Sequence, residues 1–320
     1  MIRTTTLGVQ NQLMSYIADN QAAYIKAQMQ MSSQTKISKP SDNVSDASEI
    51  ININRDQANI KNYLDNISTA KVQTNLIDTV FAQAISNLQD ANDYALQASN
   101  SIYSTEQLNA IKSSVDQITS GMIDLANTSY NGQYIFSGSN TATKPYTAAA
   151  DGSVVYDGSS SAVNDTRTLE IYDGEYIQLN VNGDSAFGSY VPPVVDAVTG
   201  DITTPSSGSG AFKALGDLSF ALGQDPPDYD AIRSCLSTLE DSIDQVNLKR
   251  TEVAGYGGQR LELTQSYLEN TNLNLTEQKS NLKDLDMTEA ATDLMNKYYS
   301  YQASMQATSQ GLSISLLNYI

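Results

Sequence analysis

The chain has 320 residues, enough for two or three compact units with a sizeable core. Its 36 acidic and 18 basic residues give a net charge of −18 at pH 7, which argues against nucleic acid and anionic membranes as partners because both need a basic face. The absence of histidine excludes Ser-His-Asp triads, Cys-His pairs and His-ligated metal sites.

The N-terminus does not have the pattern of a Sec-type signal peptide. Met1–Thr6 lacks the continuous apolar core and the small-residue cleavage site of such a leader. No run of about 18 apolar residues occurs elsewhere, so we expect no transmembrane span. Export, if it occurs, is therefore expected to proceed without a cleaved signal peptide.

The first part of the chain, to about Tyr130, is predicted to be helical. Apolar residues recur every three or four positions, as in Leu13, Ile17, Tyr24, Ala27 and Met31. A second run predicts a coiled-coil seam: Leu108, Ile111, Val115, Ile118, Met122 and Leu125. Pro40 must interrupt the helical pattern, and Ser41 or Asp42 is expected to cap the helix that follows.

A β-rich insert is predicted from about Asn131 to Gly210. Thr168–Tyr172 and Tyr176–Val181 alternate as strands do. Asp157-Gly158, Asp173-Gly174 and Asn182-Gly183 are turn signals between strands. Because the insert is acidic and rich in turns, we expect an outward-facing domain that the helical core does not need.

Helices are predicted again after Gly210. A short one carries Phe212, Leu215, Leu218 and Leu222 and stops at Asp225-Pro226-Pro227, and a longer one starts near Tyr229. The final run has the most regular spacing: Met287, Ala291, Leu294, Tyr298, Tyr301, Met305, Thr308, Leu312 and Leu316. Because an isolated amphipathic helix is marginal in water, each terminal stripe is expected to pack against the other and against neighbouring subunits.

The segment Tyr298–Ile320 contains no Asp, Glu, Lys or Arg. A membrane anchor would also be uncharged, but the many amides and hydroxyls of this segment would be costly in lipid. A helix enclosed by protein on several sides, as inside a tube, fits better. We therefore predict subunit-assembly contacts on the two terminal stripes, at Leu13, Ile17, Tyr24, Met31, Leu294, Tyr298, Tyr301, Met305, Leu312 and Leu316.

The predicted fold class is mainly α with a β-rich insert. The N- and C-terminal arms are expected to form a long antiparallel helical bundle or coiled coil, with a small β domain between them. The predicted segments are an N-terminal helical assembly segment (1–42), a first part of the helical core (43–130), a β-rich outer domain (131–210), a second part of the helical core (211–285) and a C-terminal helical assembly segment (286–320).

No motif predicts catalysis or a cofactor. Gly255-Tyr256-Gly257-Gly258 lacks the lysine of a phosphate-binding loop and is interpreted as a turn or hinge between helices. Asp225–Asp230 and Asp284–Asp286 are interpreted as helix stops followed by acidic caps rather than calcium loops. The single cysteine, Cys235, excludes intrachain disulfides and lies in an apolar helical run, so it is predicted to be a core residue.

Several motifs resemble one known family. Pro40-Ser41-Asp42, preceded by Ser32-Ser33 and Lys36, is similar to a Ser-Ser-Gly-Lys…Pro-Ser-Asp-Asp-Pro segment of the flagellin superfamily, from which Gln34-Thr35 and Asn43-Val44 depart. Further matches are the segments Asn131–Gly138, Arg250–Gly255, Gln259–Leu261, Ser280–Ala290 and Ser315–Ile320. Their order resembles the flagellar hook-associated protein 3 family, the hook–filament junction proteins.

This resemblance implies a structural, non-enzymatic component of the bacterial flagellum, exported through the type III apparatus with a cytoplasmic chaperone. It implies a ring of subunits between the first hook-associated junction protein and the filament flagellin. The implied location is extracellular, at the hook–filament junction. Two alternatives stay open at this point: filament flagellin itself, and a secreted enzyme or adhesin that acts through the β insert.

Overall fold

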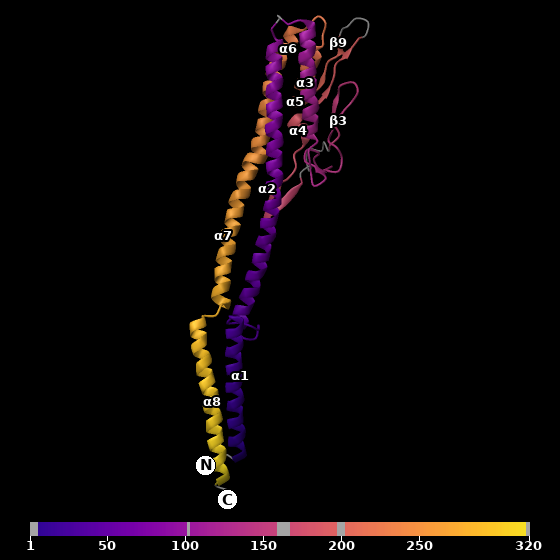
Figure 1. Cartoon of the computed structure of the whole chain (residues 1–320). Helices are drawn as coiled ribbons and strands as arrows, with labels where there is room; N and C mark the ends of the chain where they lie inside the picture. The colour runs from indigo at the N-terminus through magenta and orange to yellow at the C-terminus, as the bar shows by residue number, and fades with distance from the viewer. Residues whose placement is uncertain (1–5, 101–102, 159–166, 197–201, 318–320) are drawn as a thin grey trace. The chain divides into compact units, whose positions relative to one another are not determined.

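The computed structural model describes residues 6–100, 103–158, 167–196 and 202–317, except for the side chains of 6–7, 9–10 and 311–317 (Figure 1). The helices are α1 (Thr6–Ser33), α2 (Val44–Ala98), α3 (Thr105–Ala126), α4 (Gly183–Phe187), α5 (Gly210–Leu222), α6 (Tyr229–Arg250), the π-helix η1 (Thr251–Tyr256), α7 (Gly257–Lys283) and α8 (Met287–Leu317). The strands are β1 (Ser129–Tyr130), β2 (Gln133–Tyr134), β3 (Tyr146–Ala148), β4 (Val154–Tyr156), β5 (Thr168–Tyr172), β6 (Glu175–Gln178), β7 (Ser189–Val191), β8 (Val194–Val195), β9 (Ile202–Thr204) and β10 (Ser207–Ser209).

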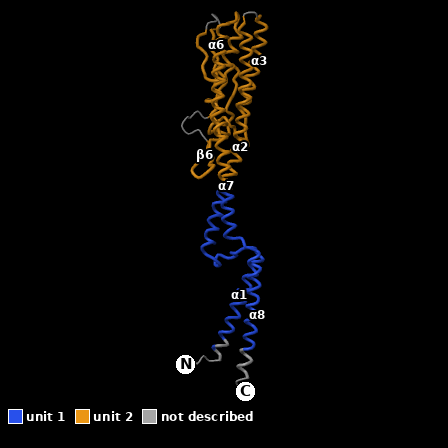
Figure 2. Tube along the Cα trace, turned by 90° about the vertical axis from the view of Figure 1, so that its left-hand side faces the viewer, with its two compact units in different colours: residues 1–60, 269–320 blue, residues 61–268 orange. Residues whose placement is uncertain are grey.

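The chain divides into two compact units, coloured separately in Figure 2. One unit contains residues 1–60 and 269–320, and the other contains residues 61–268. Both ends of the chain therefore belong to the same unit, and the whole β insert belongs to the other. The predicted class, mainly helical with small sheets between two helical arms, is confirmed.

The unit of residues 61–268 contains the hydrophobic core. Its part of α2 buries a residue at alternating intervals of three and four, which is the seam of a coiled coil. The buried positions are Ile67, Ala70, Thr74, Ile77, Phe81, Ala84, Leu88, Ala91, Ala95 and Ala98. The seam predicted on α3 is confirmed, because Leu108, Val115 and Met122 are fully buried. Cys235 on α6 is buried in the same core.

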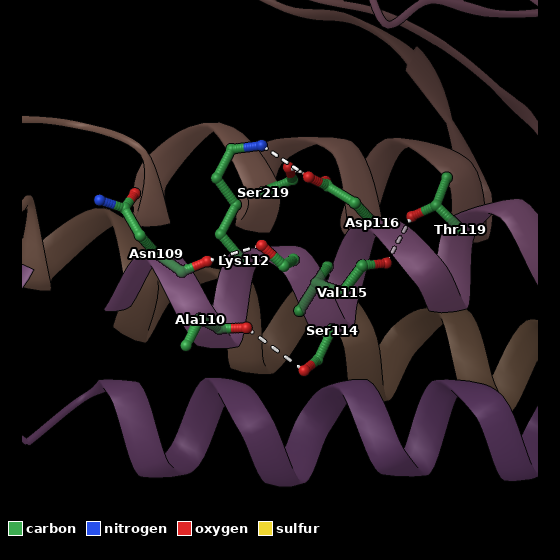
Figure 3. Close-up of polar contacts among 9 residues, drawn as sticks. Asn109, Ala110, Lys112, Ser114, Val115, Asp116, Thr119 and Ser219 are labelled. Atoms are coloured by element: carbon green, nitrogen blue, oxygen red, sulfur yellow. Dashed lines mark hydrogen bonds and ion pairs between the residues drawn. The ribbon is translucent and has the colours of Figure 1, made fainter. Parts of the chain in front are cut away.

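Helix α3 packs against α5, and a small polar group lies at the edge of this contact (Figure 3). The Lys112 ammonium lies 2.7 Å from a carboxylate oxygen of Asp116, one helical turn away. The other oxygen of Asp116 accepts a hydrogen bond from the Ser219 hydroxyl on α5. The two helices are thus joined by a polar bridge at the rim of an otherwise apolar interface.

The β insert is built from short antiparallel pairs rather than one large sheet. The largest sheet has the order β10-β7-β4-β3, and β1–β2, β5–β6 and β8–β9 are two-stranded. Strand β5 has the predicted bounds, and Asp173-Gly174 forms the turn to β6, with Gly174 at a φ of 71°. Asn182-Gly183 is not a turn between strands, because the Asn182 side chain caps α4 by accepting a hydrogen bond from the Ser185 N–H.

The expectation that the helical core does not need the insert is wrong. The rings of Phe136 and Phe187, both from the insert, lie 5.5 and 5.7 Å from the ring of Phe81 on α2. Tyr146 of β3 lies 4.9 Å from Phe212 on α5. These rings are fully buried in one cluster with the helices, so the insert supplies part of the core.

Candidate assembly surface

The candidate site lies in the unit of residues 1–60 and 269–320, where α1 and α8 run side by side (Figure 1). A break in the helical structure follows α1, another precedes α8, and backbone hydrogen bonds join the two breaks. The Lys36 N–H donates to the Lys283 carbonyl at 2.7 Å, and the Leu285 N–H donates to the Gln34 carbonyl at 3.1 Å. The start of the C-terminal helix is therefore fixed beside the end of the N-terminal one.

Asp42 stabilises the break between α1 and α2. One of its carboxylate oxygens lies 3.0 Å from the Lys26 ammonium, and the other accepts hydrogen bonds from the N–H groups of Ser38 and Lys39. The contact with Lys26, followed by the bond from Lys39, lowers the pKa of Asp42 from 3.8 to about 2.

The caps of α2 and α8 follow the same chemistry. The expectation that Ser41 or Asp42 caps α2 is wrong, because Asp42 is engaged inside the turn. The Asn43 side chain caps the helix instead, by accepting from the N–H groups of Ser45 and Asp46. At α8 the predicted cap is confirmed: Asp286 accepts from the N–H groups of Thr288 and Glu289, which lowers its pKa.

The stripes on α1 and α8 face each other through aromatic rings. The ring of Tyr24 lies 5.6 Å from that of Tyr298 and is stacked on that of Tyr301 at 6.3 Å. Stripe residues that are only half-buried are Leu13, Ile17, Tyr24, Met31, Leu294 and Tyr301. The side chains of Leu312 and Leu316 lie outside the described residues. The structure therefore brings Tyr24, Tyr298 and Tyr301 together.

Much apolar surface on these two helices is exposed in the part of the chain that the structure describes. Tyr298 and Met305 of the stripe keep 38% and 41% of their area exposed. A further exposed set, absent from the sequence prediction, lies on other faces: Met14, Tyr16, Ile25, Met29, Met295 and Tyr299. The sequence already carried this signal, because α1 has apolar residues beyond a single stripe. Large apolar side chains exposed in such number are typical of an interaction surface.

Neither a cluster of metal-ligating side chains nor a membrane-spanning helix is found among the described residues. Among them no group of three or more Cys, Asp or Glu side chains is placed to hold a metal ion. None of the described helices is long and apolar enough to cross a membrane. A turn or a hinge between helices was expected at Gly255-Tyr256-Gly257-Gly258; the segment forms no turn, because it lies where η1 joins α7 in one helical run. Burial raises the pKa of the Cys235 thiol to about 11, so this thiol is unreactive.

Comparison with known proteins agrees with this geometry. Residues 5–141 match the bacterial flagellin N-terminal helical region, and residues 236–320 match the bacterial flagellin C-terminal helical region. The flagellar hook-associated protein 3 of Escherichia coli is 24% identical over 99% of this chain and 100% of its own length. That of Salmonella typhimurium is 26% identical over 99% of this chain and 100% of its own length.

Solved structures share the fold. FlgL of Bacillus cereus has a TM-score of 0.56 and 23% identity, covering 72% of this chain and 99% of that one. The flagellar junction protein FlgL of Legionella pneumophila has a TM-score of 0.56 and 14% identity, covering 75% of this chain and 100% of that one.

The chain belongs to the flagellin family, whose two helical regions together cover more than half of it. Within that family it groups with the flagellar hook-associated protein 3 relatives over nearly its full length. It is therefore a structural component of the flagellum at the hook–filament junction, outside the cell, and not an enzyme. The alternatives of filament flagellin and of a secreted enzyme or adhesin are set aside.

Proposed function

We propose that the chain joins hook to filament as a ring of identical copies held together through α1 and α8. In this proposal the ring contacts the first hook-associated junction protein on one side and filament flagellin on the other. A cytoplasmic chaperone covers the terminal helices before type III export. No cofactor is involved.

One observation carries the proposal: the terminal helices have almost no core of their own. Within residues 1–60 and 269–320, the buried apolar side chains of the described part are Ala27, Ala47, Ile53 and Ile60. Most burial in a stable helix pair comes from large apolar residues at the contact. Here the large residues stay half-exposed or exposed, so α1 and α8 gain most of their burial only when other copies surround them.

The charge pattern supports the same surface. From Tyr298 onward the sequence has no charged residue, so association there strands no ion away from water. The acidic residues that give the net charge of −18 lie elsewhere and keep the free subunit soluble. A surface that is apolar, uncharged and unpaired in one copy is suited to a contact between copies.

The test is photocrosslinking in assembled flagella. Tyr298 is replaced by p-benzoylphenylalanine, and isolated hook–filament complexes are irradiated and analysed by size on denaturing gels. We expect dimers and higher multiples of this chain, because Tyr298 lies on the exposed edge of the α1–α8 stripe. The matched control carries the same replacement at Lys144, an exposed residue of the insert. Crosslinks between copies from Lys144 but none from Tyr298 would contradict assembly through the terminal helices.

A further inference from the structure

Helices α6, η1 and α7 form one uninterrupted helical run from Tyr229 to Lys283. The residues that flank η1, Arg250 and Gly257, both have helical φ and ψ angles, so the run has no break. A π-helical turn holds one residue more than an α-helical turn, and such turns often mark functional positions. The run thus contains an extra residue at η1.

The buried seam shows what this extra residue does. On α6 the seam recurs at intervals of three and four: Ile232, Cys235, Leu239, Ser242 and Val246. On α7 it resumes at Leu261 and Leu268, seven residues apart. Leu261 follows Val246 by 15 residues, whereas two heptads span 14. The π-helix absorbs the difference and keeps Leu261 in line with the seam of α6.

A second apolar stripe on α7 is displaced by one residue toward the N-terminus from the buried seam. If the run were α-helical throughout, the seam of α6 would continue onto Lys249, Val253, Tyr256, Arg260, Leu263 and Tyr267. Three of these side chains are large, apolar or aromatic, and exposed: Tyr256 at 70%, Leu263 at 67% and Tyr267 at 55%. One residue corresponds to a rotation of about 100° around the helix axis. The sequence of α7 therefore fits the seam in two registers, of which this structure shows one.

The surroundings of η1 leave room for such a rotation. One cavity of about 430 Å³ lies between η1 and β6, lined by Val253, Tyr256 and Ile177 among others. Another, of about 460 Å³, lies between η1 and α2 and is lined by Gly255 and Gly258. A side chain added at Gly258 would meet no atom within 4 Å. Both spaces are grooves open to solvent, so side chains on these two sides of η1 can move without displacing a close-packed interior.

Besides the burial of Leu261 and Leu268, polar and aromatic contacts to the β5–β6 hairpin and to α2 hold the present register. Arg260 and Glu175 form an ion pair at 3.6 Å in which both side chains are about half exposed, and such pairs contribute little. The ring of Tyr267 packs against Tyr172 at 5.7 Å, near the same turn of the β5–β6 hairpin. Lys71 on α2 donates to the Gln265 side chain at 2.8 Å. Each of these contacts depends on which residues of α7 face the β5–β6 hairpin and α2.

We propose that η1 is a register switch: it converts between the π-helix seen here and a continuous α-helix, and α7 rotates by about one residue. In the second form Leu263 and Tyr267 turn toward the seam, and Leu261 and Leu268 turn away from it. This is a two-state change of packed elements. It gives one sequence two subunit forms, and it goes beyond the proposed role at the junction, since it is tested in the free protein.

The test measures which residue of α7 faces position 71. Two double variants are made, Lys71→Cys with Gln265→Cys for the present register and Lys71→Cys with Thr264→Cys for the rotated one. Both are treated with a short bismaleimide, and the ratio of the Thr264 to the Gln265 crosslink is measured. Buried Cys235, with its raised pKa, stays unmodified, and the variants that carry only one of the two introduced cysteines give the background.

Leu261→Ala removes a buried side chain from the present seam, so the ratio should rise several-fold. The matched control is Leu239→Ala, which removes an equally buried leucine from α6 and favours neither register, so the ratio should not change. Deletion of Gly255 removes the extra residue and should lower the ratio to background while the protein stays folded by circular dichroism. A ratio that is the same in the parent, Leu261→Ala and the deletion variant would overturn the switch.

Discussion

The substitution Met305→Asp tests the assembly role of α8 with little effect on the free subunit. Met305 lies on the terminal stripe and keeps 41% of its area exposed in one copy. Full burial of a Met side chain contributes about 1.5–3 kcal/mol, so burying this remainder between copies contributes roughly 0.6–1.2 kcal/mol per subunit. A carboxylate at the same position costs several kcal/mol, because no cation is available from Tyr298 onward in the sequence.

We expect the Met305→Asp protein to be made and to unfold at nearly the parental temperature, because the core of residues 61–268 is untouched. Cells should carry hooks but release filament subunits into the medium, measured by immunoblotting of culture supernatants. The control is Gln306→Asp, which adds the same charge one position off the stripe and should be milder. The reasoning is refuted if the two variants release equal amounts of filament protein, or if Met305→Asp cells swim normally.

Three further predictions concern the fold. Phe187→Ala should destabilise the protein by about 3–5 kcal/mol in urea unfolding, because its ring is fully buried. Tyr176→Ala, at the exposed hairpin, should change the free energy of unfolding by no more than about 0.5 kcal/mol. Equal losses of stability in the two variants would contradict the packing of the insert into the core. Gln34→Gly should raise stability by up to about 1 kcal/mol, because Gln34 has a φ of 57° and relief of about 1–2 kcal/mol of left-handed strain exceeds the roughly 0.5–1 kcal/mol entropic cost of glycine; a lower melting temperature would contradict this. Lys26 lowers the pKa of Asp42 from 3.8 to about 2. The ionised Asp42 therefore stabilises the α1–α2 break fully above pH 4, and this stabilisation is lost as the pH falls toward 2. Asp42→Asn should remove this acid dependence, and an unchanged acid titration would count against it.

Periodic features could be predicted from the sequence because burial enforces their spacing. The runs on α3 and α5 recur at helical intervals. On α5 the predicted positions are buried, and on α3 they are alternately buried and partly buried against the core. Strand β5 alternates and has the predicted bounds. These patterns depend on neighbours within one element, so they are visible without knowledge of the fold. The five segment boundaries and the assembly role of the stripe residues stay predictions.

Features set by tertiary contacts could not be predicted in this way. Glycines 255, 257 and 258 indicated a turn, but each costs only about 1 kcal/mol in a helix, and the seam on both sides outweighs that cost. The spacing of 15 residues between Val246 and Leu261 was the available signal for the π-helix. The core role of the insert depended on which surface its aromatic rings, such as Phe136 and Tyr146, would meet. The exposed second set on α1 and α8 was hidden because the prediction considered one stripe per helix.

The location of the chain in the flagellum decides whether it acts as the junction. Immunogold labelling of isolated flagella, with antibodies raised against the insert, distinguishes the outcomes. We predict a single band of label at the tip of the hook, and bare hooks without filaments in cells that lack the gene. Label along the whole filament would contradict a junction role, as would normal filaments on cells without the protein.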